Sequence, residues 1–220
     1  MMASLRPQSA QVTPVVGFIL VSNLLVYILQ RTTEWQLIAN FALWPIHDSP
    51  YRPDFRPWQV LTYGWLHGNN AHIFVNMFAV WMFGKTIEQV WGSRRFAFYY
   101  LVCVVGAGLV QLFVTTRMAA GGDLPAATVG ASGGVFGLLL AFALLFPNQM
   151  IVLLIPPIPM KAKYFVIAYG ALELYLGFTR TDSGVAHFAH LGGMLFGFIL
   201  IRYWVFQRKR KLNRESDPPD

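Results

Sequence analysis

The sequence predicts an all-α membrane protein, a bundle of six transmembrane helices with both termini in the cytoplasm. First, the 220 residues are 55% apolar and only 12% charged, which leaves too little polar surface for a soluble domain. Second, six apolar segments are long enough to cross, or nearly cross, a bilayer core of about 30 Å. Third, the cationic residues gather in alternate connections. The net charge of +7 therefore needs no nucleic acid to explain it.

Clusters of Gly, Pro, Asn, Asp and Arg separate the six predicted spans. These spans cover residues 15–29, 71–87, 96–116, 130–146, 164–178 and 187–206. The first follows Arg6, but no small-residue cleavage site closes it, so we expect an uncleaved span and not a signal peptide. The apolar run 150–155 is too short to span and is expected to lie at the interface. The single cysteine, Cys103, lies in an apolar run, which predicts a buried, inert thiol and no intrachain disulfide.

The distribution of Lys and Arg orients the bundle. With the amino terminus in the cytoplasm, 12 of the 17 cations fall inside and five outside, in agreement with the positive-inside rule, and the reverse orientation would violate that rule. The inner set comprises Arg6, Lys85, Arg94, Arg95, Lys161, Lys163, Arg202, Arg208, Lys209, Arg210, Lys211 and Arg214. The outer set comprises Arg31, Arg52, Arg56, Arg117 and Arg180.

The chain divides into three parts by composition. Residues 1–14 form a cytoplasmic segment, 15–206 the six-span domain, and 207–220 a basic tail that we expect to be disordered. The long outer loop 30–70 is rich in aromatic residues, which is typical of a segment in the headgroup layer. Its tryptophans are Trp35, Trp44, Trp58 and Trp65. No internal repeat is visible, a weak argument against transporters built on duplicated halves.

Polar side chains able to do acid–base chemistry are rare inside membrane spans and are functional by default. The second span carries His72 and Asn76 one helical turn apart, the fourth begins near Ser132, and the sixth begins with His187 and His190. These three spans run in the same direction, so residues in their first two turns share a depth of at most about 10 Å below the outer surface. Taken singly, the serine could be a packing residue and the asparagine an interhelical hydrogen bond. Taken together, they predict a site.

Glycines at helical spacing allow the spans that carry these side chains to approach closely. Gly133 and Gly137 follow the serine, and Gly193 and Gly197 continue the face of His190. A serine hydroxyl becomes a good nucleophile when a histidine within about 3 Å takes its proton, and a tetrahedral intermediate needs hydrogen-bond donors for its oxyanion. Because no Asp lies in any span, we expect a Ser-His dyad without the carboxylate of a triad.

Three motifs resemble those of the rhomboid family of intramembrane serine proteases, over about residues 58–197. They read His-Gly-Asn-Asn-Ala-His-Ile-Phe-Val-Asn at 67–76, Gly-Ala-Ser-Gly at 130–133, and Ala-His-Leu-Gly-Gly-Met-Leu-Phe-Gly at 189–197. The resemblance implies that the enzyme hydrolyses a peptide bond in or beside a substrate's transmembrane segment, without metal or cofactor. It implies that Ser132 is the nucleophile and His190 the general base. It also implies that His72, Asn76 and the Ser132 backbone N–H bind the oxyanion.

The resemblance assigns further residues and exposes two departures. It places His67 and Gly130 in the vicinity of the active site, and Glu88 as a structural carboxylate at the inner end of the second span. Many relatives follow the loop tryptophan, here Trp58, with Arg, whereas this chain has Gln59. Several bacterial members have Tyr beneath the catalytic imidazole where this chain has Phe136, whose ring can still stack.

Two ionisable residues in the spans are harder to assign. His187 competes with His190 for the role of base, and the spacing of His190 from the glycines favours His190, with His187 at the rim. Glu173, in the middle of the fifth span, is expected to be protonated or paired with a tyrosine or backbone group, or to take part in gating.

The sequence thus predicts an intramembrane serine protease of the bacterial inner membrane, with its site open to the extracytoplasmic side. Its partners would be transmembrane protein substrates and the lipid bilayer, with no cofactor, metal or nucleic acid. The alternatives are a non-proteolytic rhomboid-like protein that escorts client helices and, third, a channel or transporter. The oligomeric state stays open.

Overall fold

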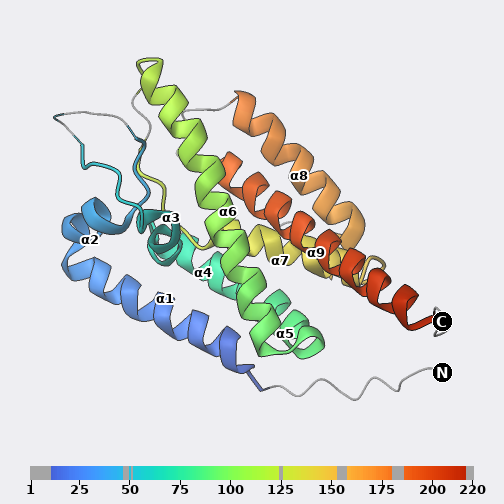
Figure 1. Cartoon of the computed structure of the whole chain (residues 1–220). Helices are drawn as coiled ribbons and strands as arrows, with labels where there is room; N and C mark the ends of the chain where they lie inside the picture. Colours follow the sequence, from blue (N-terminus) through green and yellow to red (C-terminus); the bar gives the residue numbers. More distant parts are fainter. Residues whose placement is uncertain are drawn as a thin grey trace.

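The computed structural model describes residues 11–46, 50, 52–123, 126–152, 158–179 and 186–216, and these residues are mostly helical. Its helices pack side by side, with α6 running through the middle of the bundle (Figure 1). In chain order the elements are α1 (Pro14–Thr32), α2 (Glu34–Phe41), α3 (Gln59–Thr62), η1 (Tyr63–Trp65), α4 (Asn70–Ala79), η2 (Val80–Gly84), α5 (Lys85–Trp91), α6 (Ser93–Ala120), α7 (Ser132–Leu145), β1 (Met150–Val152), β2 (Pro159–Lys161), α8 (Ala162–Thr179) and α9 (His187–Ser216).

Every predicted span corresponds to helix, but in the described part of the chain three helices meet a strict criterion of length and apolarity for crossing a membrane. These are α1, α6 and α9, and α7 is apolar but shorter. The second predicted span is a continuous helical run in which α4 passes through a π-helical turn, η2, into α5. The fifth is α8. The fold is therefore a helical membrane bundle, and the number of spans stays a prediction.

Contacts between distant segments show which helix ends lie together. The Tyr27 hydroxyl near the end of α1 donates to Oδ1 of Asn70 at the start of α4 over 2.6 Å. At the opposite end of the bundle, the guanidinium of Arg95 lies 4.0 Å from the ring centroid of Trp204 in α9. The start of α1 and the last turns of α9 also lie at one end (Figure 1). The starts of α4, α7 and α9 occupy the other end.

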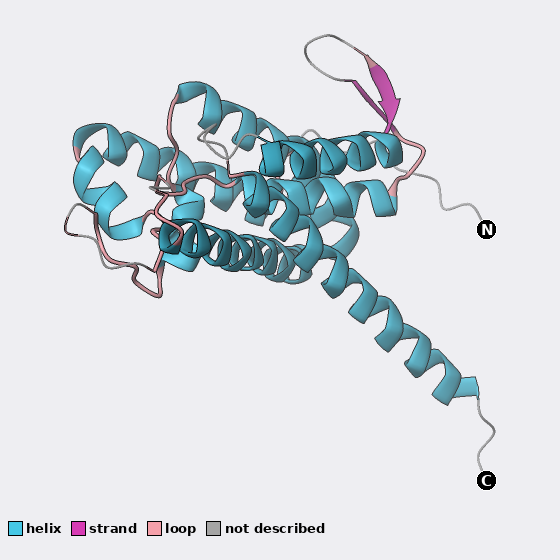
Figure 2. Cartoon of the chain, turned by 90° about the horizontal axis from the view of Figure 1, so that it is seen from above, coloured by secondary structure: helices cyan, strands magenta, loops and turns pink. Residues whose placement is uncertain are grey.

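The last helix differs from the prediction. The sixth span was expected to end at residue 206 and to give way to a disordered tail, but α9 continues to Ser216 and projects beyond the bundle (Figure 2). The predicted disorder of 207–216 is therefore wrong. The Lys- and Arg-rich segment contains good helix formers and no Pro or Gly, and Lys211 and Glu215 pair at i,i+4 over 3.7 Å. Residues 217–220 lie outside the described part.

The apolar run expected at the interface begins as a strand. β1 pairs with β2 in an antiparallel hairpin, with Ile151 opposite Met160. The hairpin lies at the edge of the molecule (Figure 2). The remainder of that run, 153–155, lies outside the described residues, as does the amino-terminal stretch 1–10.

The outer loop is more structured than its composition predicts, because it contains α2, α3 and η1. Trp35 and Trp58 are exposed, as a headgroup location requires, whereas Trp44 is buried. The departure at Gln59 is explained by its contacts. This fully buried side chain accepts hydrogen bonds from the backbone N–H groups of Trp44 and Arg56, at 3.3 and 3.2 Å. Gln59 therefore connects two distant parts of the loop through hydrogen bonds in its interior.

Candidate active site

Ser132 and His190 meet across two helices. Ser132 is the first residue of α7 and His190 lies in the first turn of α9, and their Oγ and Nε2 atoms are 2.8 Å apart. The serine is partly exposed and the histidine is buried. The first backbone N–H groups of a helix have no partner within that helix, so the start of α7 also offers donors and a positive dipole end. The pair has the geometry of a nucleophile and its base.

Glycine contacts set the spacing between these two helices. A Cβ atom on Gly193 would collide with the backbone of Gly133, so α7 and α9 touch through their main chains. A Cβ on Gly137 would collide with the side chain of Cys103, and one on Gly197 with the Tyr99 hydroxyl, both from α6. The predicted small-residue seams are therefore real, and they extend to α6. They bring the starts of α7 and α9 within reach of each other.

His72 faces the serine across Gly130. The backbone N–H of Gly68 donates to Nδ1 of His72 over 3.3 Å, so the neutral ring carries its proton on Nε2. Gly130 has a φ of +128°, and a Cβ there would lie 2.8 Å from that Nε2 and 3.7 Å from the serine Oγ. Only glycine allows this approach. His72 is thus a neutral N–H donor beside the Ser132 hydroxyl.

Asn76 and His67 lie close to His72 but make no described contact with Ser132. Asn76 is buried one turn further along α4, and its amide donates to the His72 carbonyl over 2.9 Å. That bond uses one of two amide hydrogens, which leaves a second for a ligand. His67 is fully buried, with its ring edge-on to that of His72 at a centroid separation of 5.1 Å.

Phe136 stacks on His190, as its ring was expected to allow. Its ring is stacked on the His190 imidazole, with centroids 4.2 Å apart and planes 7° from parallel. The absent hydroxyl therefore does not prevent stacking. From the other side, Gln111 of α6 accepts a hydrogen bond from the Ala189 N–H over 3.1 Å, which fixes the start of α9.

The expectation that no carboxylate accompanies the histidine is wrong. Oε2 of Glu173 lies 2.9 Å from Nδ1 of His190 and 2.6 Å from Nδ1 of His187. His187 is therefore buried beside His190 and not at a rim, and Glu173 pairs with histidines instead of a tyrosine or the backbone. The spacing of residues along the sequence does not predict this cluster, because α8 is a separate helix whose rotation and depth are set by packing. The one sequence feature that pointed to it was an ionisable residue, Glu173, in the middle of a predicted span.

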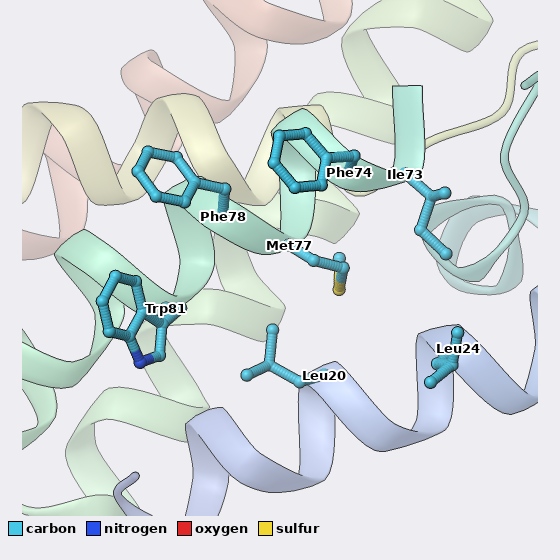
Figure 3. A pocket seen from close by; sticks show the side chains of 7 residues that line it. All are labelled: Leu20, Leu24, Ile73, Phe74, Met77, Phe78 and Trp81. Carbon is cyan, nitrogen blue, oxygen red and sulfur yellow. The ribbon is translucent and has the colours of Figure 1, made fainter. Parts of the chain in front are cut away.

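A separate hollow of about 420 Å³ contains none of the candidate site residues (Figure 3). It lies between α1 and the run from α4 to η2. Its lining is almost entirely apolar and consists of Leu20, Leu24, Ile73, Phe74, Met77, Phe78 and Trp81. Because none of these side chains titrates, the hollow offers no acid–base chemistry, and the candidate site is the cluster around Ser132.

Fold and site together define a helical membrane protein with a serine–histidine pair at the starts of two adjacent helices. Comparison with known families gives a specific match, because a family model described as "Rhomboid domain" covers residues 54–207. The chain belongs to the rhomboid family.

Relatives from yeast, plants and animals support this assignment. Rhomboid protein 1, mitochondrial, of Saccharomyces cerevisiae is 31% identical over 152 residues, which cover 66% of this chain and 42% of that protein. Rhomboid-like protein 11, chloroplastic, of Arabidopsis thaliana is 28% identical over 91% of this chain and 68% of its own length. The mouse presenilin-associated rhomboid-like protein, mitochondrial, is 28% identical over 84% and 47%.

The chain thus spans about two fifths of the length of the yeast relative. The organelle names of these relatives give no support to the predicted bacterial inner membrane.

Proposed function

We propose that this protein is an intramembrane serine endopeptidase that hydrolyses peptide bonds in or near the transmembrane segments of membrane-protein substrates. The observation that carries the proposal is the 2.8 Å separation of Ser132 Oγ and His190 Nε2, contributed by two helices and far apart in sequence. A serine that served only helix packing would need no imidazole at this distance.

The proposed reaction proceeds by acyl transfer. His190 takes the proton of Ser132 as its oxygen attacks the scissile carbonyl, and the oxyanion is stabilised by His72 Nε2–H, the Asn76 amide and the N–H groups at the start of α7. His190 then gives the proton to the leaving amine, and water hydrolyses the acyl-enzyme by the same steps in reverse order.

The proposed topology has six spans, both termini in the cytoplasm and the site open to the opposite side. The clustering of the helix starts of α4, α7 and α9 at one end of the bundle, opposite the cation-rich end of α9, supports it. A phosphatase that is active only outside the cytoplasm should be inactive when it is fused after residue 216. An active fusion would contradict the proposed topology.

Labelling with a fluorophosphonate probe tests the proposed chemistry. The purified protein in detergent should react covalently at Ser132, and Ser132→Ala should not react. Equal labelling of both proteins would remove the nucleophile assignment. Binding of a single-span client without cleavage, in both proteins, would favour the escort function instead.

A further inference from the structure

Glu173 is a buried carboxylate that the dyad mechanism leaves unused. It lies in the middle of α8, where its neighbours Leu172 and Leu174 are exposed apolar residues, yet Glu173 itself is only 7% exposed. An ionisable group in such a helix is costly unless it is paired. It turns inward to the two histidines at the start of α9.

The tautomer required of His190 connects this carboxylate to the reaction. To accept the proton of Ser132, Nε2 must be unprotonated, so a neutral imidazole carries its hydrogen on Nδ1. Nδ1 is the atom that lies 2.9 Å from Oε2 of Glu173. After proton transfer the ring is cationic, and the neighbouring carboxylate stabilises that charge.

The same oxygen is shared with His187. The contact of Oε2 with Nδ1 of His187 is a well-directed hydrogen bond at 2.6 Å, whereas the contact with Nδ1 of His190 is short but misaligned for one. His187 thus holds the carboxylate in place, and a small turn of the His190 ring in its stack on Phe136 would align the second bond.

We propose that Glu173 is a positioning residue that completes a Ser132–His190–Glu173 arrangement, fixing the Nδ1–H tautomer of the base and stabilising its imidazolium form. This inference rests on the proposed protease function. In this proposal Glu173 of α8 acts on the reaction through His190 and makes no contact with the substrate.

Glu173, His187 and His190 also meet a geometric criterion for a metal site, with their ligand atoms within 4.8 Å of one another. Two of the separations, 2.6 and 2.9 Å, are shorter than about 3.3 Å, the spacing expected between ligands that each lie about 2.0 Å from a tetrahedral zinc ion. A metal would have to push them apart, so direct histidine–carboxylate pairing is favoured.

The test measures fluorophosphonate labelling of the full chain over a range of probe concentrations, which separates the maximal rate from the concentration at half-saturation. Glu173→Gln should lower the maximal rate about 100-fold or more and leave half-saturation within about two-fold, because the amide favours the wrong tautomer. Glu173→Asp should recover part of the rate. Glu88→Gln, a matched change of a remote buried carboxylate, should label like the wild type while folded.

The outcomes separate the two proposals. An unlabelled wild type would overturn the protease function and this inference together. A labelled wild type with an equally fast Glu173→Gln would overturn the positioning role alone. Loss of wild-type labelling on chelation, restored by zinc, would replace that role with a metal site.

Nitrogen-15 NMR of histidine in the wild type supplies a reading that needs no variant. The expected result is a neutral His190 protonated on Nδ1. Protonation on Nε2 would overturn the inference even if every variant failed to fold.

Discussion

Two buried glutamates lie at opposite ends of this bundle, and their partners give them different roles. Glu88 accepts four hydrogen bonds, from the N–H groups of Val15 and Val16 and from the hydroxyls of Thr13 and Ser93. All four donors are neutral groups fixed at the starts of α1 and α6. Glu173 instead meets two imidazoles, one of which contacts a serine.

The comparison teaches that burial alone does not identify a functional carboxylate. Glu88 and Glu173 are 2% and 7% exposed, which does not distinguish them. A carboxylate whose partners cannot titrate stabilises one conformation, whereas one whose partners exchange protons can influence a reaction. The end of the bundle that holds Glu88 is therefore expected to govern stability, and the end that holds Ser132 is expected to govern activity.

The largest expected change in cleavage rate distinguishes His190 from His187, the two histidines that contact Glu173. His190→Ala is expected to lower the cleavage of a model single-span substrate by about 1000-fold or more, because it removes the base at Ser132. His187→Ala should cost only a few-fold, since it loosens the carboxylate without removing the base. Initial cleavage rates in detergent measure both, and the opposite order would make His187 the base.

Glu88→Gln should sharpen the contrast from the inner end. The change removes one of two accepting oxygens, so buried donors at the start of α1 lose a partner at a cost of about 2 kcal/mol in the free energy of unfolding. Thermal unfolding in detergent should show a lower Tm, while the rate per folded molecule stays within about two-fold. An unchanged Tm with reduced activity would erase the distinction between the two ends.

Phe136 offers a smaller test at the outer end. Phe136→Leu removes the ring stacked on His190 and should lower the cleavage rate about three- to ten-fold, with the Tm reduced modestly. Phe136→Tyr keeps the stack and should stay within about two-fold of the wild type. A rate equal to wild type in the leucine variant would show that Glu173 and His187 orient the base without help from Phe136.

The smallest effect at neutral pH concerns His67, in the segment before α4. Burial, reinforced by the nearby His72, lowers the pKa of His67 to about 3. In the unfolded chain the His67 imidazole is protonated below about pH 6.5, but in the folded chain only below about pH 3. At pH 7 the ring is neutral in both states, so it does not lower the free energy of unfolding. Between these values, falling pH should reduce stability by about 1.4 kcal/mol per pH unit.

Denaturant unfolding at pH 7 and pH 5 measures this loss. His67→Phe keeps a flat ring and cannot titrate, so its stability should fall less over the same interval. Identical losses in both proteins would assign the acid sensitivity to other groups and not to His67.

The helical class and the serine–histidine pair could be predicted from the sequence because both follow from the order and direction of the helices along the chain. The starts of alternate helices lie at one end of the bundle, and the glycines beside Ser132 and His190 predict close packing of their helices. The contact of Glu173 with the histidines could not be predicted, because the rotation of α8 about its axis decides whether a mid-helix residue faces lipid or the interior, and packing sets that rotation. The length of α9 was not predicted because a high density of charge suggests disorder, although the residues of this segment are good helix formers.

The contact between Gly133 and Gly193 has a mechanical consequence for a protein in a fluctuating bilayer. At this contact main chain rests directly on main chain, so no flexible side chain lies there to be compressed or extended. We therefore expect thinning or thickening of the membrane to tilt α7 and α9 together. The distance between Ser132 and His190, on which the proposed reaction depends, would then vary less than the tilt of either helix.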